Sequence, residues 1–388
     1  MKILFSADWH LGFALHGANP VSRLDDQIRQ IRLIAEYIEE HDVEVLAIAG
    51  DVFEAQDRGP ALVAVRRMIQ ALERPLARGL KVVAIAGNHD RDYFMDTASA
   101  WLGVEAGEGG EHFLFRTRPE LLPVSARGET VNFALLPYPT ATRYPLDEEG
   151  VEGTGERNER LAEVFCDTME QMQRDAAGLG VPTVLLTHVT IQGHTVNAHR
   201  LSQRDDVAIP RGRFPEFELT AIGHIHKAER LGGGHVHYVG ALDRMDAGEK
   251  DYEPRVLLAD VGPKGVRDLR SLPLDPTPIV EITASTEEDL EREREWMKDP
   301  GRTLVKLSLR VPYGHYTAPL IHRARELFPR LYGNVEHIWE DRPVVAPVAR
   351  DLDPADVPGT VRRYLEQQDL SDDERAALLQ LVEELLRA

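Results

Sequence analysis

The chain has 388 residues, of which 43% are hydrophobic, and a formal net charge of −20. This length allows one large domain and a smaller one, and no apolar run approaches the length of a membrane span. The negative charge argues against a protein that simply coats nucleic acid, because such binding depends on neutralising phosphates. It does not exclude an enzyme whose cations are bound metals. A single cysteine, Cys166, and an N-terminus without a signal-peptide pattern favour a cytoplasmic protein.

The first 190 residues alternate between strand-like and helix-like segments. Short apolar runs rich in β-branched residues predict buried strands at 2–7, 43–49, 81–86 and 182–187. Apolar residues at helical spacing predict helices at 22–41 and 60–78, the second beginning at Pro60 and ending before Gly79. This alternation predicts an α/β layered fold.

The pattern changes in the second half of the chain. Closely spaced strands are expected between about 218 and 272, whereas the acidic, glycine-rich stretch 146–160 is expected to be a solvated loop. Prolines near 273–278 and 343–347 bracket a segment with mixed strand and helix character. We therefore predict a main domain at 1–275, a small appended domain at 276–345 and C-terminal helices at 346–388. The last helix, 371–388, has an apolar stripe that fits equally well docking on its own chain and binding to a partner.

Five stretches share one design, in which an apolar strand runs out into side chains that can bind metal. They are "FSADWH", "AIAGDVFE", "AIAGNHD", "VLLTHVT" and "AIGHIH", which supply Asp8, His10, Asp51, Asn88, His89, Asp90, His188, His224 and His226. In an open α/β sheet, side chains beyond the carboxyl ends of neighbouring strands converge on one crevice. Each stretch alone is weak evidence, and "HVH" at 235–237 is interpreted as ordinary surface. Five such stretches in one chain predict a shared site.

The ligand types point to a pair of divalent ions with a shared carboxylate. Asp51 is the predicted bridge, with Asp8, His10 and His226 at one ion and Asn88, His188 and His224 at the other. Carboxylate, amide oxygen and imidazole without thiolate suit six-coordinate metals, so two Mn²⁺ are expected, with Mg²⁺ or Fe²⁺ as alternatives. Such a pair activates the hydrolysis of phosphate esters.

His89 and Asp90 are the predicted catalytic residues. His89 would protonate the leaving oxygen or stabilise the transition state, and Asp90 would orient the His89 ring and fix its protonation. The alternative is that His89 and Asp90 only brace the turn.

In this order, the motifs D-x-H, GD, GNH[DE], a lone H and GHxH resemble those of the calcineurin-like metallophosphoesterases. The resemblance implies two stacked mixed β-sheets flanked by helices, where the alternation alone suggests a single parallel sheet. Within the superfamily, "KILFSADWHLG", "GDVFE", "GNHD" and "TAIGHIHK" followed by "YVGALDR" resemble the SbcD-type proteins, the bacterial branch of the meiotic-recombination-eleven DNA repair nucleases.

The finer resemblance implies a manganese-dependent exonuclease and endonuclease that processes DNA ends in double-strand break repair. It also implies a capping domain at 276–345 that binds DNA, and a homodimer held by helices, for which 61–78 and 94–103 are the candidates. The C-terminal helices would bind an SbcC-type structural-maintenance ATPase.

Two features depart from this expectation. Archaeal and eukaryotic relatives commonly have a second histidine three positions after the bridging aspartate, where this chain has Glu54. The acidic balance also requires a local basic rim for DNA, for which the candidates Arg200, Arg204, Arg211 and Arg213 fit a solvated loop equally well. The rival functions are a metallophosphoesterase acting on a nucleotide or phosphoprotein, and a non-catalytic scaffold subunit.

Overall fold

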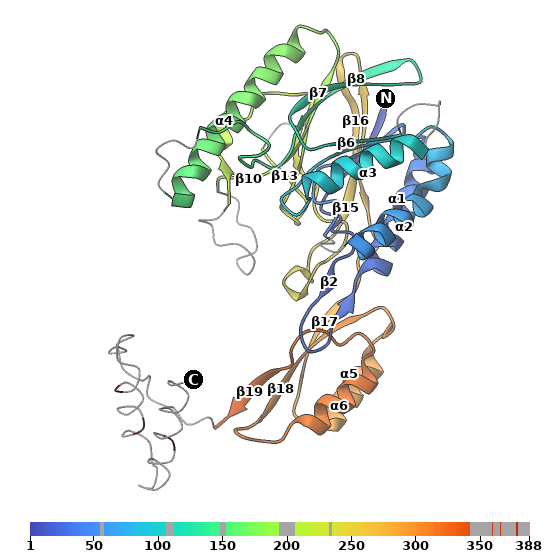
Figure 1. Ribbon diagram of the computed structural model, residues 1–388. Coiled ribbons are helices and arrows are strands. Elements are labelled where there is room, and N and C mark those ends of the chain that lie inside the picture. Colours follow the sequence, from blue (N-terminus) through green and yellow to red (C-terminus); the bar gives the residue numbers. More distant parts are fainter. Residues whose placement is uncertain are drawn as a thin grey trace. The chain divides into compact units, whose positions relative to one another are not determined.

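The computed structural model describes residues 1–54, 58–105, 112–147, 153–193, 206–232 and 235–341, together with Gly359, Leu365 and Leu378. Its largest part consists of two six-stranded mixed sheets with helices on their outer faces (Figure 1). The predicted fold class is therefore confirmed, in the form of the stacked sheets that the family resemblance implies.

The first sheet has the strand order β16-β15-β1-β4-β5-β6. Its four strands β1, β4, β5 and β6 are parallel, whereas β15 pairs antiparallel with both β1 and β16. The bounds are β1 (Lys2–Ser6), β4 (Val45–Ile48), β5 (Lys81–Ile85), β6 (Phe113–Arg116), β15 (Arg255–Gly262) and β16 (Gly265–Pro273).

The second sheet has the strand order β13-β14-β12-β9-β8-β7. Strands β8, β9, β12 and β14 are parallel, and each edge strand pairs antiparallel with its neighbour. The bounds are β7 (Glu120–Ala126), β8 (Glu129–Leu136), β9 (Thr183–His188), β12 (Leu219–Gly223), β13 (Glu229–Arg230) and β14 (Val236–Tyr238).

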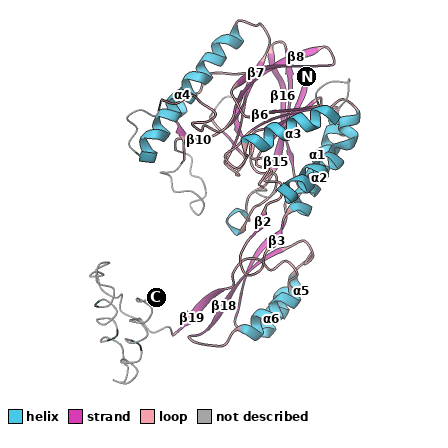
Figure 2. Cartoon of the chain, in the orientation of Figure 1, coloured by secondary structure: helices cyan, strands magenta, loops and turns pink. Residues whose placement is uncertain are grey.

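Alternating side chains divide the apolar residues into three layers. In β1, Ile3 and Phe5 point into the core between the two sheets, whereas Leu4 faces the helices α1 (Leu24–His41), α2 (Arg58–Ala77) and α3 (Asp92–Glu105). Helix α4 (Gly153–Ala177) lies on the outer face of the second sheet (Figure 2). Its buried residue Phe165 packs against the strands of that sheet. Both sheets are thus buried on both faces, which explains why their central strands read as continuous apolar runs.

The solvated loop predicted at 146–160 is wrong in its second half, because α4 begins at Gly153. Leu161 and Phe165 are buried against the second sheet, and an ion pair between Glu156 and Arg160 links successive turns before them. Packing and side-chain pairs of this kind outweigh the low helix propensity of the glycines.

Shorter elements lie around the sheets. They are β2 (Ala14–Leu15), β3 (Val21–Ser22), β10 (Thr190–Ile191), β11 (Ala208–Ile209) and the 3₁₀ turns η2 (Arg211–Arg213) and η3 (Ala247–Glu249). No helix within the described ranges has the length and apolar content needed to cross a bilayer.

The chain then forms a small α+β segment in the order β17 (Ile279–Ala284), α5 (Glu287–Trp296), β18 (Leu304–Pro312), α6 (Ala318–Leu327) and β19 (Glu336–Glu340). A capping box starts α5, in which Thr286 and Asp289 exchange hydrogen bonds. Contacts divide the chain into one unit of 1–309 and 317–336 and a second unit of 310–316 and 337–388. The predicted boundaries at 275 and 345 stay predictions, and the helix predicted at 371–388 lies outside the described residues except for Leu378.

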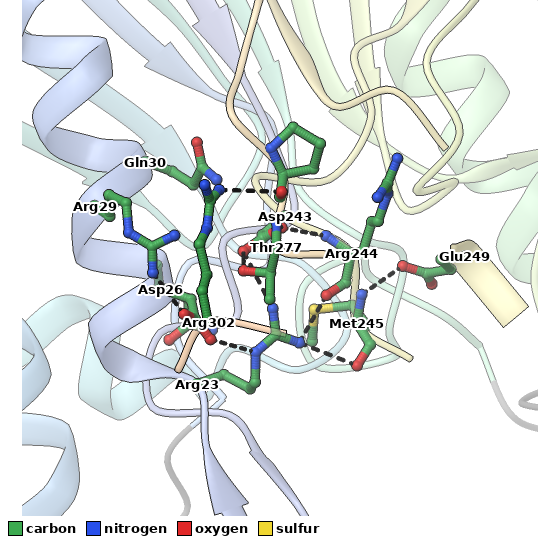
Figure 3. Close-up of polar contacts among 12 residues, drawn as sticks. Arg23, Asp26, Arg29, Gln30, Asp243, Arg244, Met245, Glu249, Thr277 and Arg302 are labelled. Carbon is green, nitrogen blue, oxygen red and sulfur yellow. Dashed lines mark hydrogen bonds and ion pairs between the residues drawn. The ribbon is translucent and has the colours of Figure 1, made fainter. Parts of the chain in front are cut away.

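A buried polar network joins the start of α1 to the loop after β14 and to the start of the α+β segment (Figure 3). The guanidinium of Arg23, which is 1% exposed, donates to Asp26, to Asp243 and to the carbonyls of Arg244 and Met245. Asp243 in turn accepts a bond of 2.7 Å from the backbone N–H of Thr277. The buried charges are therefore paired, as burial requires.

Candidate metal centre

The predicted ligands follow five strands whose carboxyl ends lie at one edge of the two sheets. Asp8 and His10 follow β1, Asp51 follows β4, and Asn88 follows β5, which are adjacent parallel strands of the first sheet. In the second sheet, His188 ends β9, and His224 and His226 follow the adjacent parallel strand β12. The convergence expected from strand ends is what the structure shows.

Asp8, His10 and His226 form the first cluster, and their ligand atoms all lie within 4.8 Å of one another. The Nε2 atoms of His10 and His226 are 3.2 Å apart. Each Nδ1 faces a carboxylate, Glu54 at 2.8 Å from His10 and Glu249 at 2.7 Å from His226, so each neutral ring carries its proton on Nδ1. The two Nε2 lone pairs then point toward each other, an arrangement that a cation between them stabilises.

Asn88, His188 and His224 form the second cluster. The amide oxygen of Asn88 is 3.0 Å from Nε2 of His188 and 3.0 Å from Nδ1 of His224. The His188 Nδ1 donates to the carbonyl of Ala49 at 2.7 Å, which fixes the tautomer and leaves Nε2 as the ligand atom. Two nitrogen ligands at right angles on one ion, each about 2.1 Å from it, are about 3.0 Å apart. The separations in both clusters are therefore those of ligands to a common ion.

Asp51 lies between the two clusters. Its Oδ2 is 3.3 Å from Nε2 of His188 and 3.6 Å from Nε2 of His10, while its Oδ1 accepts the backbone N–H of His89 at 2.9 Å. One carboxylate oxygen thus faces a histidine of each cluster. This is the placement that the predicted bridging role requires.

The electrostatics of the site favour bound positive charge. Asp8 and Asp51 are buried, with 0% and 2% of their surfaces exposed. Burial acts to raise the pKa of Asp51, but His188, His10 and His89 outweigh it and hold that pKa well below its ordinary value. For His188, burial acts to lower the pKa, yet Asp51 and Asp8 raise it to about 9. Buried carboxylates need a cation, and a divalent ion meets that need by displacing protons.

Several site residues adopt backbone conformations that non-glycine residues rarely adopt. Asp8, His10, Asp51 and His224 all have positive φ, between 45° and 84°. Left-handed backbone at a non-glycine residue costs of order 1–3 kcal/mol and clusters at functional sites. Gly50 has φ +87, and a Cβ there would be 2.2 Å from Nδ1 of His188. The turns after these strands therefore orient the ligand side chains toward the site at a cost in local stability.

His89 lies beside the clusters and is the more accessible side chain, with 42% of it exposed. Its Nδ1 is 2.8 Å from Oε2 of Glu54, and its ring makes an edge contact with that of His10, with 4.8 Å between centroids. The predicted partnership with Asp90 is wrong. Asp90 is buried, and its carboxylate accepts the backbone N–H groups of Val52, Phe53 and Gly87.

Asp90 therefore joins the turns that follow β4 and β5. This agrees with the alternative that Asp90 only braces the turn. Burial and Asp51 raise the pKa of Asp90 to about 6, against the three N–H donors, which lower it. The side chain oriented toward His89 is Glu54 instead.

Sequence reasoning missed the carboxylates that hold the histidine rings. Asp206 accepts from Nε2 of His224 at 3.0 Å and from the hydroxyl of Tyr138 at 2.8 Å. Burial acts to raise the pKa of Asp206, but His224, Thr190 and Tyr138 lower it to about 2. Glu249 holds His226, and its second oxygen accepts the backbone N–H of Met245 at 2.8 Å (Figure 3). Glu54 was noticed only as a departure from the family pattern.

Two other sequence-based predictions concern this region. His237, in the stretch interpreted as surface, belongs to none of the metal-ligand groups found among the described residues. Of the four arginines considered for a basic rim, Arg200 and Arg204 lie outside the described residues. Arg213 pairs with Asp167 at 3.0 Å and Glu170 at 2.8 Å, both in α4, so its charge is already neutralised.

The donor set fits divalent metal ions. It combines carboxylate and amide oxygens with imidazoles and no thiolate, and three further carboxylates fix the rings. Partners of this kind orient metal-binding histidines and raise their basicity. In addition to the first cluster, two more groups of side chains, Asp8, Asp51 and His188, and His10, Glu54 and His89, have ligand atoms within 4.8 Å.

The chain is similar to proteins of known structure and to one protein family. The chain is similar in fold to a dimetal phosphatase from Danio rerio, with 10% identity, a TM-score of 0.38, and coverage of 71% of this chain and 99% of that one. It is also similar to the NAD nucleotidase of Haemophilus influenzae, with 11% identity, a TM-score of 0.36, and coverage of 85% of this chain and 60% of that one. Residues 1–228, which contain every predicted metal ligand, match the calcineurin-like phosphoesterases. The chain belongs to the calcineurin-like phosphoesterase family.

Proposed function

We propose that the chain is a two-metal phosphodiesterase that cleaves DNA at its ends, as the nuclease subunit of an SbcCD-type complex. The observation that carries the hydrolytic part is the placement of Asp51. Its Oδ2 faces one histidine of each cluster, at 3.3 and 3.6 Å, with the half-exposed His89 alongside. The DNA substrate and the complex rest on the resemblance of the motif stretches.

The residues divide the chemistry between them. Divalent ions, with two Mn²⁺ as the proposed pair, would supply charge neutralisation at the phosphate and activation of a water nucleophile. Asp8, His10 and His226 would hold one ion, Asn88, His188 and His224 the other, and Asp51 both.

His89 provides the proton. Burial acts to lower the pKa of His89, but Glu54 and Asp51 outweigh it and raise that pKa above its ordinary value. The ring is therefore suited to protonate the leaving oxygen as a general acid near neutral pH.

Exposed apolar side chains support the proposed homodimer. Leu62 and Val63, at the start of α2, are 51% and 48% exposed, and Tyr93 in α3 is 54% exposed. These residues lie in or beside the two ranges proposed for the dimer. Replacing Leu62 by Glu should convert a dimer to a monomer in light scattering, whereas an unchanged mass would remove α2 from the interface.

A nuclease assay with its controls tests the main proposal. Blunt duplex DNA labelled at one end is incubated with the protein and Mn²⁺, in parallel with a nucleoside monophosphate and a phosphopeptide. We expect nucleotides or short fragments to be released from the duplex, and the variant His89→Asn to lose cleavage while retaining bound metal. Turnover of the small phosphoesters without any cleavage of DNA would contradict the DNA assignment but keep the hydrolase.

The rival, a phosphoesterase acting on a nucleotide or phosphoprotein, has one observation in its favour. The net charge is −20, and Arg213 is paired with two carboxylates of α4. Such a surface attracts a long polyanion such as DNA only weakly. The nuclease assay with its small-phosphoester controls therefore decides between the two classes of substrate.

A further inference from the structure

Gln27 is a buried glutamine whose side chain contacts the turn that carries a metal ligand. It lies near the start of α1 and is 2% exposed. Its Nε2 donates to the carbonyls of Trp9 and His10, at 3.1 and 2.6 Å, and its Oε1 accepts the N–H of Gly12 at 3.1 Å. The His10 carbonyl also accepts the N–H of Phe13 at 2.9 Å. Both polar atoms of the buried amide are therefore used on one turn.

The opposite side of this turn is held by the turn after β4. The N–H of His10 donates to the carbonyl of Asp51 at 2.9 Å, and the N–H of Leu11 donates to that of Val52 at 3.0 Å. These two bonds use N–H groups of the turn, whereas Gln27 satisfies its carbonyls. His10 has φ +45, which non-glycine residues rarely adopt. Gln27 therefore helps to hold a strained turn in place.

The start of α1 is a fixed base for this contact. The backbone N–H of Gln27 donates to the carbonyl of Arg23 at 3.0 Å. Arg23 is 1% exposed and donates to Asp243 at 3.1 Å and to the carbonyl of Arg244 at 2.7 Å, in the buried network of Figure 3. A side chain whose own backbone is held in this way can define the position of the turn that it contacts.

His10 connects the turn to the first metal cluster. Its Nε2 lies 3.2 Å from Nε2 of His226, so a displacement of the His10 backbone moves a ligand of the first ion. The second cluster takes its ligands from the turns after β5, β9 and β12. A change at Gln27 should therefore affect one ion much more than the other.

We propose that Gln27 is a positioning residue for the first metal ion, because its carboxamide holds the turn of residues 9–12 in the conformation that directs His10 toward that ion. The inference rests on the proposed function, which supplies the bound ions. Gln27 acts through the backbone of His10, in contrast to the carboxylates of Glu54, Asp206 and Glu249, which contact the histidine rings.

The test compares Gln27→Met with wild type. Methionine keeps the space filled, but it cannot donate to the two carbonyls and is only a weak acceptor for Gly12. Gln30→Met is the matched control. Gln30 is also buried in α1, and it exchanges hydrogen bonds with the backbone of Asp275, in a segment without predicted ligands. Both variants remove a buried amide from the same helix.

The first readout needs no metal. Amide hydrogen exchange, followed by NMR in the metal-free protein, reports whether the Gly12 N–H has lost its acceptor. We expect this N–H to exchange about 10-fold faster in Gln27→Met than in Gln30→Met, because only the first variant removes its hydrogen bond.

The second readout is Mn²⁺ binding by calorimetry. We expect two sites in wild type and in Gln30→Met. In Gln27→Met, one site should weaken by about 10- to 100-fold, as when other partners of metal ligands are lost, and the second by about threefold or less. Mn²⁺ is paramagnetic and broadens the NMR signals of the imidazoles that bind it. Limiting Mn²⁺ should therefore broaden His188 and His224 before His10 in this variant.

Wild-type Mn²⁺ binding in Gln27→Met, or an equal weakening of both sites, would overturn the proposal, as would unchanged exchange of the Gly12 N–H. If Gln27→Met does not fold, Gln27→Asn decides, because its amide is one methylene shorter and cannot reach all three groups of the turn; the same loss at one site is expected. If wild type binds Mn²⁺ but cleaves no phosphoester, the proposed function fails, yet the binding data still decide the role of Gln27.

Discussion

Gly50 offers a direct test of how the fold positions a metal ligand. It has φ +87, and a Cβ at this position would be 2.2 Å from Nδ1 and 2.6 Å from Cγ of His188. The ring cannot easily move, because it is completely buried and hydrogen-bonded to the carbonyl of Ala49 at 2.7 Å. Ordinary contact begins near 3.4 Å, so Gly50→Ala requires a shift of about 1.2 Å in the ring or the turn.

The size of that shift sets the expected effect. Metal–ligand distances tolerate about 0.2 Å, and a misplacement of about 1 Å can cost roughly 100-fold in activity. We expect about a 100-fold loss of kcat/KM and at least a 10-fold loss of Mn²⁺ affinity. The free energy of unfolding should also fall, by about 1–2 kcal/mol from the backbone and about 1–3 kcal/mol from overpacking.

Gly79→Ala is the matched control. Gly79 has φ +90, but a Cβ there would have no neighbour within 4 Å. This variant should carry the backbone cost alone and keep its metal affinity and activity. The assays are urea denaturation, calorimetry with Mn²⁺ and hydrolysis of a chromogenic phosphodiester. If Gly50→Ala matched Gly79→Ala in all three, the argument that Gly50 exists to seat His188 would be refuted.

Three further predictions concern other residues. Burial acts to raise the pKa of Asp26, but Arg330 and Arg23 hold it below its ordinary value of 3.8. The stabilisation from Asp26 is therefore present above that pH and lost as the pH falls below it. Asp26→Asn should lower the free energy of unfolding at pH 7 by about 3 kcal/mol and make it fall less steeply in acid, so an equal acid dependence of the two proteins would contradict this. Glu249 accepts from His226 with Oε1 at 2.7 Å and from Met245 with Oε2 at 2.8 Å. Glu249→Gln keeps an oxygen at only one of these two positions, so it should weaken Mn²⁺ binding by about 10-fold. Unchanged calorimetry would remove Glu249 from the centre. Burial raises the pKa of the Cys166 thiol to about 11, so alkylation of Cys166 at pH 7.5 should be negligible until the protein unfolds. Mass spectrometry measures the alkylation, and rapid labelling of the native protein would disprove the expectation.

The metal cluster was the most predictable part of the molecule. Asp8 and Asp51 follow the adjacent parallel strands β1 and β4, and His188 ends β9 in the second sheet. Parallel strands of one sheet bring their carboxyl ends together whatever the sequence distance. The strand order therefore predicted the convergence within each sheet, and the stacking of the two sheets brings the two sets of ligands together. Their assignment to particular ions stays a prediction.

The partners of those residues were not predictable from local sequence. Asp206 and Glu249 reach His224 and His226 from loops whose course depends on tertiary packing. Asp90 was misassigned because its partners are backbone N–H groups of Val52, Phe53 and Gly87, which no residue pattern encodes. In the fold, the alternation of strands and helices suggested one parallel sheet, because the antiparallel pairing of β15 with β1 depends on contacts across more than 250 residues.

The proposed metal centre can be tested by counting and locating the bound ions. The protein is loaded with Mn²⁺, its metal content is measured by mass spectrometry, and the ions are located by anomalous diffraction. We expect two ions per chain, with Asp51 touching both, and a clear loss of binding in Asp51→Asn. A single ion, or two ions that share no contact with Asp51, would contradict it.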